Sequence, residues 1–273
     1  MKKVLSVVMA IAMAVACMFA VTACGAVTYK DLTIVEIGGE TESFGIAFRK
    51  GSNVTRKVEQ AIADLIAENK LASLAEKYGV AGVSEYTPAA AENASSDDFA
   101  KIQAKGKLVI GITDYKPMDY KEEGSDEWIG FDADLAKMVC AKLGITAEFK
   151  EIGWDNKILD LSAGTIDCIW NGMTITDEIK GAADVTKAYM ENRQVAVVLK
   201  KNATKYSSIE KMAGKRIAAE GGSAGESFIK GNESLKGGLV TVSGQSDAFL
   251  EVMSGKSDVA IVDYMMARAL IEG

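Results

Sequence analysis

The chain has 273 residues, of which 48% are hydrophobic and 25% are charged, and its formal net charge is −7. This is the composition of a globular protein with one large or two modest domains. Histidine is absent, which removes the commonest general base and transition-metal ligand, so neither a metal site nor a cofactor is expected. Basic residues form only isolated pairs, so nucleic acid is a poor candidate partner.

The first segment is predicted to be a secretory signal peptide. Two lysines precede an apolar run, Val4–Val21, and small residues then lead to Cys24. A basic start, an apolar middle and a small-residue exit are typical of such signals. The alternative is a transmembrane anchor, because the run is close to spanning length. The end Val-Thr-Ala-Cys resembles a bacterial lipobox, which implies removal of residues 1–23, a lipid on Cys24, and an exported protein anchored at the outer face of the cell membrane or in the periplasm.

The segment before residue 99 is predicted to contain two strands, a helical region and a linker. The strands are Leu32–Ile37 and Phe44–Phe48, and the helical region is Thr55–Tyr78 with a break near Asn69. Residues 81–98 are rich in Ala, Ser and Glu and include a proline, which indicates a linker.

From residue 107 onward, short β-rich runs alternate with helical patterns, which is typical of an α/β protein with open sheets. A polar stretch at 200–208 divides the elements into two sets, and a cleft between two such lobes is a common ligand site. The predicted strands are Leu108–Ile112, Thr146–Ile152, Ile166–Trp170, Val195–Leu199, Arg216–Ala219, Leu239–Val242 and Val259–Val262. The predicted helices are Phe131–Leu143, Ile158–Ala163, Asp177–Ala183, Glu226–Lys230, Asp247–Met253 and Tyr264–Ile271.

Two cysteines follow the signal segment, Cys140 and Cys168. In an exported protein they could form a disulfide. Both lie in apolar patterns, so two buried free thiols are an equal alternative.

Four motifs in the α/β part resemble those of family 3 of the bacterial extracellular solute-binding proteins, the amino-acid-binding partners of polar amino-acid ABC importers. They are Lys107–Thr113, Ile129–Leu135, Asp167–Asp177 and Asp258–Asp263. The resemblance implies a two-lobed periplasmic-binding-protein-like fold of type II, with a hinge and a ligand cleft between two open sheets. It also implies a lobe-closing monomer that binds a polar amino acid or similar solute and partners with ABC transporter permease subunits.

The order of the segments departs from the family. Residues 43–52, with the helices up to Gly79, resemble the family's end, yet here they come first. The simplest account is a circular permutation in which residues 81–98 join the usual termini, since new termini are tolerated in exposed loops. A scrambled chain is the alternative, and a natural and an engineered permutation look the same.

The permutation predicts how the lobes are assembled. One lobe would contain residues 99–199 and 44–80, and the other would contain residues 200–273 and 27–43. The chain would cross between the lobes near residues 199–203 and 42–45.

An amino-acid ligand needs an anion site, and the loop Glu220–Gly225 is the candidate. Glycines and a serine at a helix start expose backbone N–H groups. The alternative is an ordinary strand-to-helix turn with a serine N-cap. The resemblance favours the anion loop, through Gly222, Ser223, Ala224 and Gly225, and adds the Thr174 hydroxyl.

The remaining ligand contacts also follow from the resemblance. Asp263 matches the family's ammonium-binding acid, although by position it could equally cap a helix. The carbonyl of Gly172 would be a second acceptor. Aromatic rings over the ligand would come from Tyr115 and Trp154, whereas Trp170 is predicted to be core. Asp114, Asn171 and Met173 complete the candidate set.

One position lacks the family's residue. Ile179 occupies the place of an arginine that grips the ligand carboxylate, and Lys180 cannot replace it because adjacent helical residues point about 100° apart. We therefore expect weakened amino-acid binding, a ligand without an α-carboxylate, or a substitute base such as Arg193. Other function classes stay open: a small-acid dehydratase using Glu220, a receptor's sensing module, or an inactive scaffold.

Overall fold

The computed structural model describes residues 26–81, 86–88 and 96–273. The predicted signal peptide, Cys24 and most of the predicted linker lie outside the described residues. Within these described ranges, no helix combines the length and the apolar character that crossing a membrane requires.

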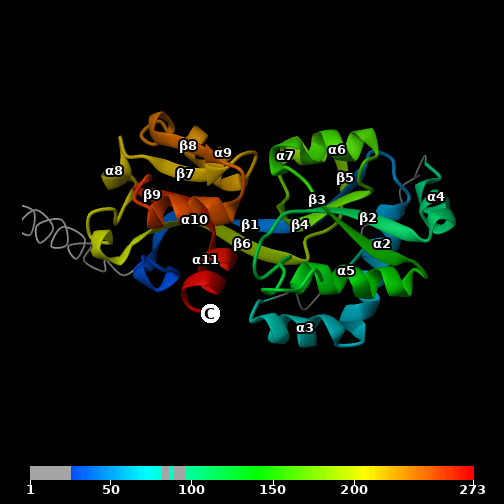
Figure 1. Ribbon diagram of the computed structural model, residues 1–273. Helices are drawn as coiled ribbons and strands as arrows, with labels where there is room; N and C mark the ends of the chain where they lie inside the picture. Colours follow the sequence, from blue (N-terminus) through cyan, green and yellow to red (C-terminus); the bar gives the residue numbers. More distant parts are fainter. Residues whose placement is uncertain (1–25, 82–85, 89–95) are drawn as a thin grey trace, which may run out of the picture.

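Two lobes, each with its own strands and helices, are joined by the long strands β1 (Leu32–Arg49) and β6 (Met190–Leu199) (Figure 1). One lobe contains α2 (Val54–Ala67), α3 (Lys70–Tyr78), α4 (Asp98–Lys105), β2 (Lys107–Ile112), α5 (Phe131–Lys142), β3 (Thr146–Glu151), η2 (Trp154–Asn156), α6 (Lys157–Ala163), β4 (Cys168–Thr174), α7 (Asp177–Ala182) and β5 (Ala183–Val185). The other contains η1 (Tyr29–Asp31), η3 (Lys200–Asn202), α8 (Ile209–Met212), β7 (Ile217–Glu220), α9 (Ala224–Gly231), η4 (Lys236–Gly238), β8 (Leu239–Val242), α10 (Gln245–Met253), β9 (Val259–Asp263) and α11 (Tyr264–Ile271).

The strands form one hydrogen-bonded path in the order β3-β2-β4-β1-β6-β9-β7-β8, with β5 paired to β1. Within each lobe the strands β2, β3 and β4, or β7, β8 and β9, pair in parallel. The long strands β1 and β6 pair antiparallel with each other and link the two sets. The two predicted sheets are therefore joined through the hinge, and the α/β, two-lobed prediction is confirmed.

The chain crosses between the lobes inside β1 and β6, not in a loop. Residues 194–197 of β6 already pair with β9 in the second lobe, whereas Met190 pairs with Phe44, which itself pairs with β4 in the first lobe. The crossing in β6 thus lies near residues 190–194, earlier than the 199–203 expected. The polar stretch after residue 199 marks the end of the strand and not the crossing, because the apolar run Val195–Leu199 already lies in the second lobe.

Local sequence explains most element boundaries. Asn69 has a left-handed φ of 58° and separates α2 from α3, which confirms the predicted break. The two predicted strands in residues 32–48 are one strand, with an irregular register between Glu36 and Thr41 and a positive φ of 70° at Gly38. Strand β4 starts two residues later than predicted and runs on to Thr174, because its polar residues lie at the lobe junction and mask the strand pattern.

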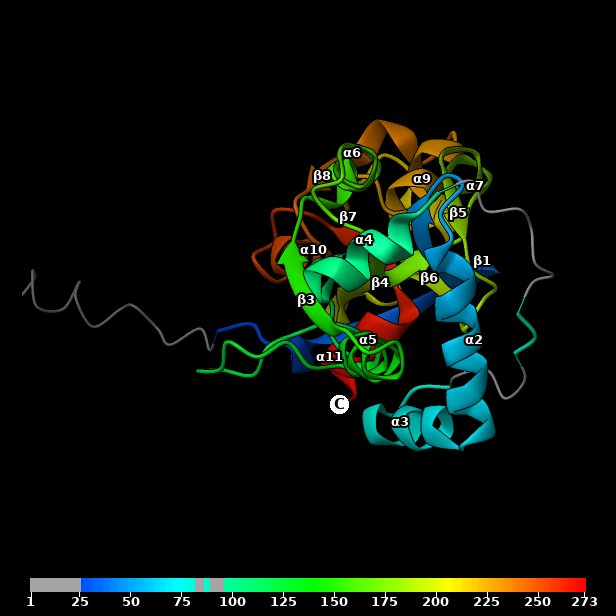
Figure 2. The same cartoon turned by 90° about the vertical axis from the view of Figure 1, so that its right-hand side faces the viewer.

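Helices cover the sheet of the first lobe, with α2 and α3 packed beside α5 (Figure 2). Trp170 is fully buried in the main apolar cluster, which confirms the prediction that it is core.

Cys140 and Cys168 are buried free thiols, so the thiol alternative is the one observed, and burial raises the pKa of Cys140 to about 12.

The end of the chain lies against its described beginning. Helix α11 contacts η1 and the start of β1, and the C-terminus lies close to that segment in Figure 1. The ring of Tyr29 meets Phe249 edge-on, with centroids 5.9 Å apart. The Arg268 guanidinium donates to the Gly79 carbonyl at 3.4 Å, which ties α11 to the end of α3.

Candidate functional site

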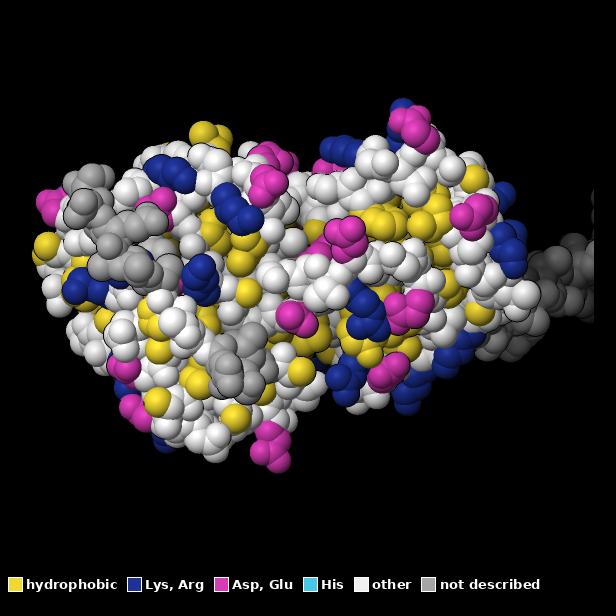
Figure 3. All heavy atoms as spheres, turned by 180° about the vertical axis from the view of Figure 1, so that it is seen from behind, with side chains coloured by type: hydrophobic (Ala, Val, Ile, Leu, Met, Phe, Trp, Pro, Cys, Tyr) yellow, Lys and Arg dark blue, Asp and Glu magenta, His cyan; other side chains and the backbone are white. Residues whose placement is uncertain are grey.

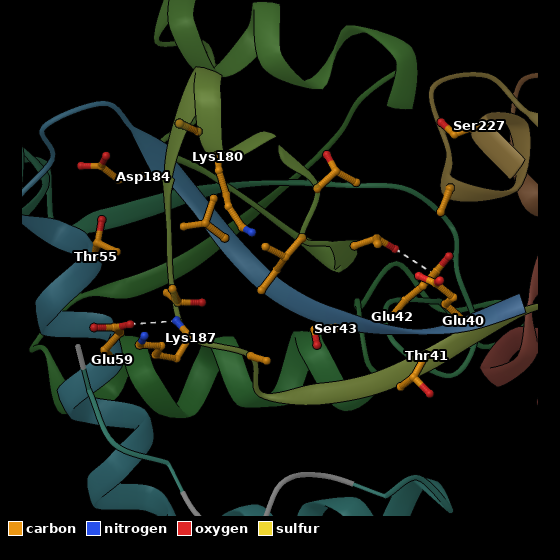
Figure 4. Close-up of a pocket in the computed structure, with 18 of the residues that line it drawn as sticks. Glu40, Thr41, Glu42, Ser43, Thr55, Glu59, Lys180, Asp184, Lys187 and Ser227 are labelled. Carbon is orange, nitrogen blue, oxygen red and sulfur yellow. Dashed lines mark hydrogen bonds between the residues drawn. The ribbon is translucent and has the colours of Figure 1, made fainter. Parts of the chain in front are cut away.

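The candidate site lies where the carboxyl ends of the parallel strands meet at the lobe junction, the usual place for ligands in open α/β sheets. A groove of about 1150 Å³ opens beside it and runs along β1 toward α2 (Figure 4). Glu42, Thr174, Gln194 and Ala224 line the inner end of this groove. Several of the other predicted site residues, among them Asp263, Tyr115 and Trp154, are buried at the lobe junction.

Asp263 ends β9 and is buried at this junction. Gln194 Nε2 donates to its Oδ1 at 2.6 Å, Asn192 donates to the same oxygen, and Gln245 donates to Oδ2. Burial raises the pKa of the Asp263 carboxyl, although these amides lower it. The side chain makes no capping bond to α11, so the helix-cap alternative is wrong. Neutral amides thus hold this carboxylate facing the junction.

Glu42, on β1, places a second carboxylate beside the first. Its Oε2 accepts hydrogen bonds from Gln194 Nε2 at 3.0 Å, Thr174 Oγ1 at 3.2 Å and Asn192 Nδ2 at 3.4 Å. Burial and then the charge of Asp263 raise the pKa of Glu42. The predicted Thr174 hydroxyl therefore points into the junction, but it serves a carboxylate that the sequence analysis did not include.

Glu220, at the end of β7, is the third carboxyl group of the junction. It is 3% exposed, and within the described part of the chain its Oε1 is buried without a hydrogen-bond partner. Burial and the charge of Asp263 raise its pKa to about 8, while Lys157 lowers it. We call Glu42, Glu220 and Asp263 the carboxylate cluster.

Tyr115 and Gly172 form the wall of the junction in the first lobe. A Cβ at Gly172 would lie 2.5 Å from Tyr115 Cε1, and the φ of 54° at Gly172 also requires glycine. The Gly172 N–H donates to Asp132 Oδ2 at 2.7 Å, which also accepts the Tyr189 hydroxyl at 2.7 Å. The Tyr115 hydroxyl is buried near Asp263 without a hydrogen-bond partner in the described chain, and burial followed by that charge raises its pKa well above the usual value.

Lys157 closes the lobes against each other. Its ammonium lies 4.7 Å from the centre of the Trp154 ring and donates to the Trp154 carbonyl at 3.0 Å within its own lobe. It also donates to the Gly222 carbonyl at 2.8 Å in the other lobe. A Cβ at Gly222 would lie 2.9 Å from the Asp155 Cα, so glycine allows this close approach. Trp154 is therefore at the junction as predicted, covered by a lysine.

The predicted anion loop is an internally capped turn. Ser223 Oγ accepts from the Glu226 N–H at 3.1 Å, which confirms the N-cap interpretation. The Glu226 carboxylate in turn accepts from the Gly222 N–H at 3.0 Å. Lys230 pairs with the same carboxylate at 2.8 Å. One of the amides expected to bind a ligand carboxylate is thus used by the protein's own carboxylate.

Five other predicted site residues lie in different surroundings from those expected. The Asn171 amide is used inside the first lobe, by Thr113 and by Asp119 at 2.7 Å. Met173 packs in an apolar cluster with Trp154 and Ile179. Asp114 is exposed to solvent, although partial desolvation of its carboxyl by the surrounding chain and then the charge of Glu151 raise its pKa. Ala224 and Gly225 form the first turn of α9, where a Cβ at Gly225 would lie 2.7 Å from the Ile261 carbonyl oxygen.

The cationic groups near the junction have partners elsewhere. Arg193, the expected substitute for the missing arginine, pairs with Glu36 at 2.6 Å and stacks on Tyr264. Lys180 is exposed and pairs with Asp177. Ile179 is buried in its apolar cluster, so its position offers no charge. Across the face in Figure 3, basic and acidic side chains are interspersed.

Sequence reasoning missed the contributions of the hinge strands. Glu42, Asn192 and Gln194 were not candidates, nor were Lys157 and Gln245. A signal was present in β6, where Asn192 and Gln194 alternate just before the apolar run and so share one face of the strand. Nothing in the sequence indicated Glu42, because its place opposite Asn192 depends on strand pairing across 150 residues.

Comparisons with known proteins agree with this architecture. Residues 108–256 match the model of a family described as bacterial extracellular solute-binding proteins, family 3. The arginine-binding extracellular protein ArtP of Bacillus subtilis is 31% identical over 176 residues, which are 63% of this chain and 67% of that protein.

Solved structures of amino-acid-binding proteins share this architecture. A mutant of arginine-bound ArgBP from T. maritima superposes with a TM-score of 0.60 at 30% identity, covering 64% of this chain and 81% of that one. The ancestral amino acid-binding protein AncCDT-1, a precursor of cyclohexadienyl dehydratase, superposes with a TM-score of 0.58 at 34% identity, covering 61% and 74%. The family match omits residues 27–80, although these residues contribute β1, α2 and α3 to the fold.

Proposed function

Because this chain belongs to family 3 of the bacterial extracellular solute-binding proteins, we propose that its lobes close on a small amine-bearing solute and present it to an ABC importer. The observation that carries this proposal is Asp263, a carboxylate buried at the lobe junction and oriented by three neutral amides. A buried carboxylate is stabilised by a charged hydrogen-bond donor, which an ammonium group supplies. Lobe closure then excludes water from the pair.

The proposed binding residues come from both lobes. Asp263 and Glu42 accept the ammonium, with the Gly172 carbonyl as a further acceptor. The rings of Tyr115 and Trp154 flank the solute in the first lobe. The bridge from Lys157 to the Gly222 carbonyl holds the closed state, since it joins the lobes directly.

A thermal-shift screen tests the proposal. The chain from Gly25 onward would be melted with each common amino acid and with simple amines, because a solute that binds only the folded state raises the melting temperature. We expect a shift with at least one of these solutes and none with Asp263→Asn. A cooperative melt that no solute shifts, at millimolar concentration, would contradict the proposal.

Export and anchoring belong to the same proposal. A lipid on Cys24 would hold the protein, as a monomer, at the outer face of the cell membrane or in the periplasm, beside the permease subunits of its importer. Labelling of cells with a fatty-acid analogue, with Cys24→Ala as the control, would detect the lipid. An unlabelled parent protein would contradict this part.

We also propose that the chain is circularly permuted. Strand β1 pairs with β4 and β6, so residues 32–49 belong to the central sheet even though they precede the matched family segment. Contact between α11 and η1 brings the chain end to the point where β1 starts. Joining Gly273 to Val27 and opening the chain in residues 82–95 should therefore leave the melting temperature and ligand affinity nearly unchanged. Loss of folding would contradict the permutation.

A second candidate function, an enzyme, is favoured by Glu220. A carboxyl with a pKa of about 8 holds a proton near neutral pH and could act as a general acid. We propose binding without turnover, because the same raised pKa follows from a site built for a cation. Chromatography of small carboxylic acids and amino acids after incubation with the protein would detect turnover if it occurs.

A further inference from the structure

We propose that the solute is a small organic cation that carries an amine or guanidine but no carboxylate. This inference rests on the proposed function, namely that a solute binds between the lobes. It specifies the charge of that solute. Four sets of observations support it.

The first is the excess of negative charge in the carboxylate cluster. Glu42, Glu220 and Asp263 come from β1, β7 and β9 and converge on one junction. They are close enough that the charge of Asp263 raises the pKa of both other acids. Coulomb repulsion of this kind in a buried site is relieved by a bound cation.

The second is a set of buried polar atoms without partners in the described residues. Glu220 Oε1 and Gln194 Oε1 are both acceptors on side chains that are 3% exposed. The orientation of Gln194 follows from its Nε2, which donates to two carboxylates. Unpaired buried acceptors are rare in folded proteins, and a ligand N–H would satisfy them. An ammonium or guanidinium group has several N–H donors and no acceptor.

The third is that basic side chains near the junction already have hydrogen-bond or ion-pair partners within the protein. Lys157 donates to the carbonyls of Trp154 and Gly222, and burial lowers its pKa. Arg193 pairs with Glu36 and faces Tyr264. Binding a solute carboxylate would require one of these groups to abandon its present partners.

The fourth is the use of the turn at α9 by the protein itself. The carboxylate of Glu226 accepts from the Gly222 N–H and pairs with Lys230. A solute carboxylate placed there would meet this negative charge. The site therefore has strong acceptors for a cation and an occupied position where an anion would bind.

Isothermal titration calorimetry with matched solutes tests the inference. Arginine and agmatine share a guanidinium group and a three- or four-carbon chain, and agmatine lacks the carboxylate. Lysine and cadaverine form a second such pair. We expect at least one decarboxylated solute to bind roughly tenfold or more tightly than its amino acid, because the carboxylate adds like-charge repulsion.

Tighter binding of the amino acid than of its decarboxylated partner in both pairs would overturn the inference and still support a solute-binding function. If none of the four bound but another amino acid did, the inference would also be overturned. If no solute of either class bound at millimolar concentration, both the inference and the proposed function would fail. These outcomes separate the two claims.

Substitutions test whether Glu220 contributes to binding of the decarboxylated solute. Glu220→Gln keeps the shape of the side chain but cannot release a proton and become negative when a cation binds, so we expect it to weaken binding of the decarboxylated solute roughly tenfold. Glu233→Gln is the matched control, since Glu233 is exposed on the same lobe and pairs with Lys236. Equal affinity in both variants would contradict a role for Glu220. The comparison of solutes on the unaltered protein decides the charge question even if Glu220→Gln fails to fold.

Discussion

The carboxylate cluster and the turn at α9 face the same junction, and the sequence analysis predicted binding residues in both, Asp263 in the first and residues 222–225 in the second. At Asp263 the hydrogen-bond donors from the described residues are neutral amides, so the charge is left for a ligand to meet. At Gly222 the backbone N–H already donates a hydrogen bond to the Glu226 carboxylate, so this N–H is not free to bind a solute carboxylate. The difference shows that residue types able to bind a charge become a site only when the fold leaves them without a partner.

Asp263→Asn should have the largest effect, because it removes a charge from the carboxylate cluster and so weakens solute binding. Removing the charge leaves the solute cation buried without its principal partner, at a cost of about 3 kcal/mol, or roughly 150-fold in affinity. Titration calorimetry would measure the loss. Asp177→Asn is a suitable control, because Asp177 is exposed outside the junction. A Kd within threefold of the parent value would show that Asp263 does not bind the solute.

The stability of the free protein should fall as the pH rises from about 6 to 8. The pKa of Glu220 is raised to about 8 in the folded chain, so the folded state holds this proton more tightly than the unfolded state does. Stability from the bound proton is therefore present at low pH and is lost as the pH approaches 8, by about 2 kcal/mol over this interval.

Several charges face Glu220 and take part in this effect. Asp263, Asp247 and Asp155 raise its pKa, and Lys157 opposes them. Urea unfolding at pH 6 and pH 8 would measure the change, and Glu220→Gln should flatten it. An equal pH dependence in parent and variant would assign the effect to other groups.

Ile179→Arg should shift solute preference toward amino acids. It adds a guanidinium beside Trp154 and Met173, where the junction now has an apolar cluster. A charge-assisted fork could then hold a solute carboxylate, worth about 1.4 kcal/mol or roughly tenfold relative to the decarboxylated partner. Ile179→Met would control for packing. An unchanged ratio of the two affinities would contradict the expectation.

Glu226→Gln should have the smallest effect. It weakens the hold on the Gly222 N–H and breaks the pair with Lys230, so the turn becomes more receptive to an anion. We expect amino-acid affinity to improve about two- to threefold, with a loss of roughly 1 kcal/mol in stability from the weakened cap. Competition with the decarboxylated solute would show the change. Weaker amino-acid binding would indicate that Glu226 supports the site.

Much of the fold could be read from local patterns. The break at Asn69, the core position of Trp170 and the strand-helix alternation depend on nearest neighbours in sequence. The crossing in β6 could not be read this way, since it lies at polar residues inside one continuous strand, whereas the polar stretch after residue 199 lies wholly within the second lobe. Of the residues at the junction, Asp263 and Tyr115 were predicted from the sequence, whereas Glu42 was missed because it reaches them by pairing between distant strands.

The sequence by itself determined the α/β class, the family and the residue types available for recognising charge, because these depend on periodicity and on short motifs. Only the tertiary structure decided which of those residues have partners. Three carboxyl groups from distant strands were brought together, and the nearby Lys157 donates to backbone carbonyls, while the turn at α9 received a carboxylate from its own helix. Charge interactions act through space, so their balance at a site follows from how the chain packs and not from the order of its residues.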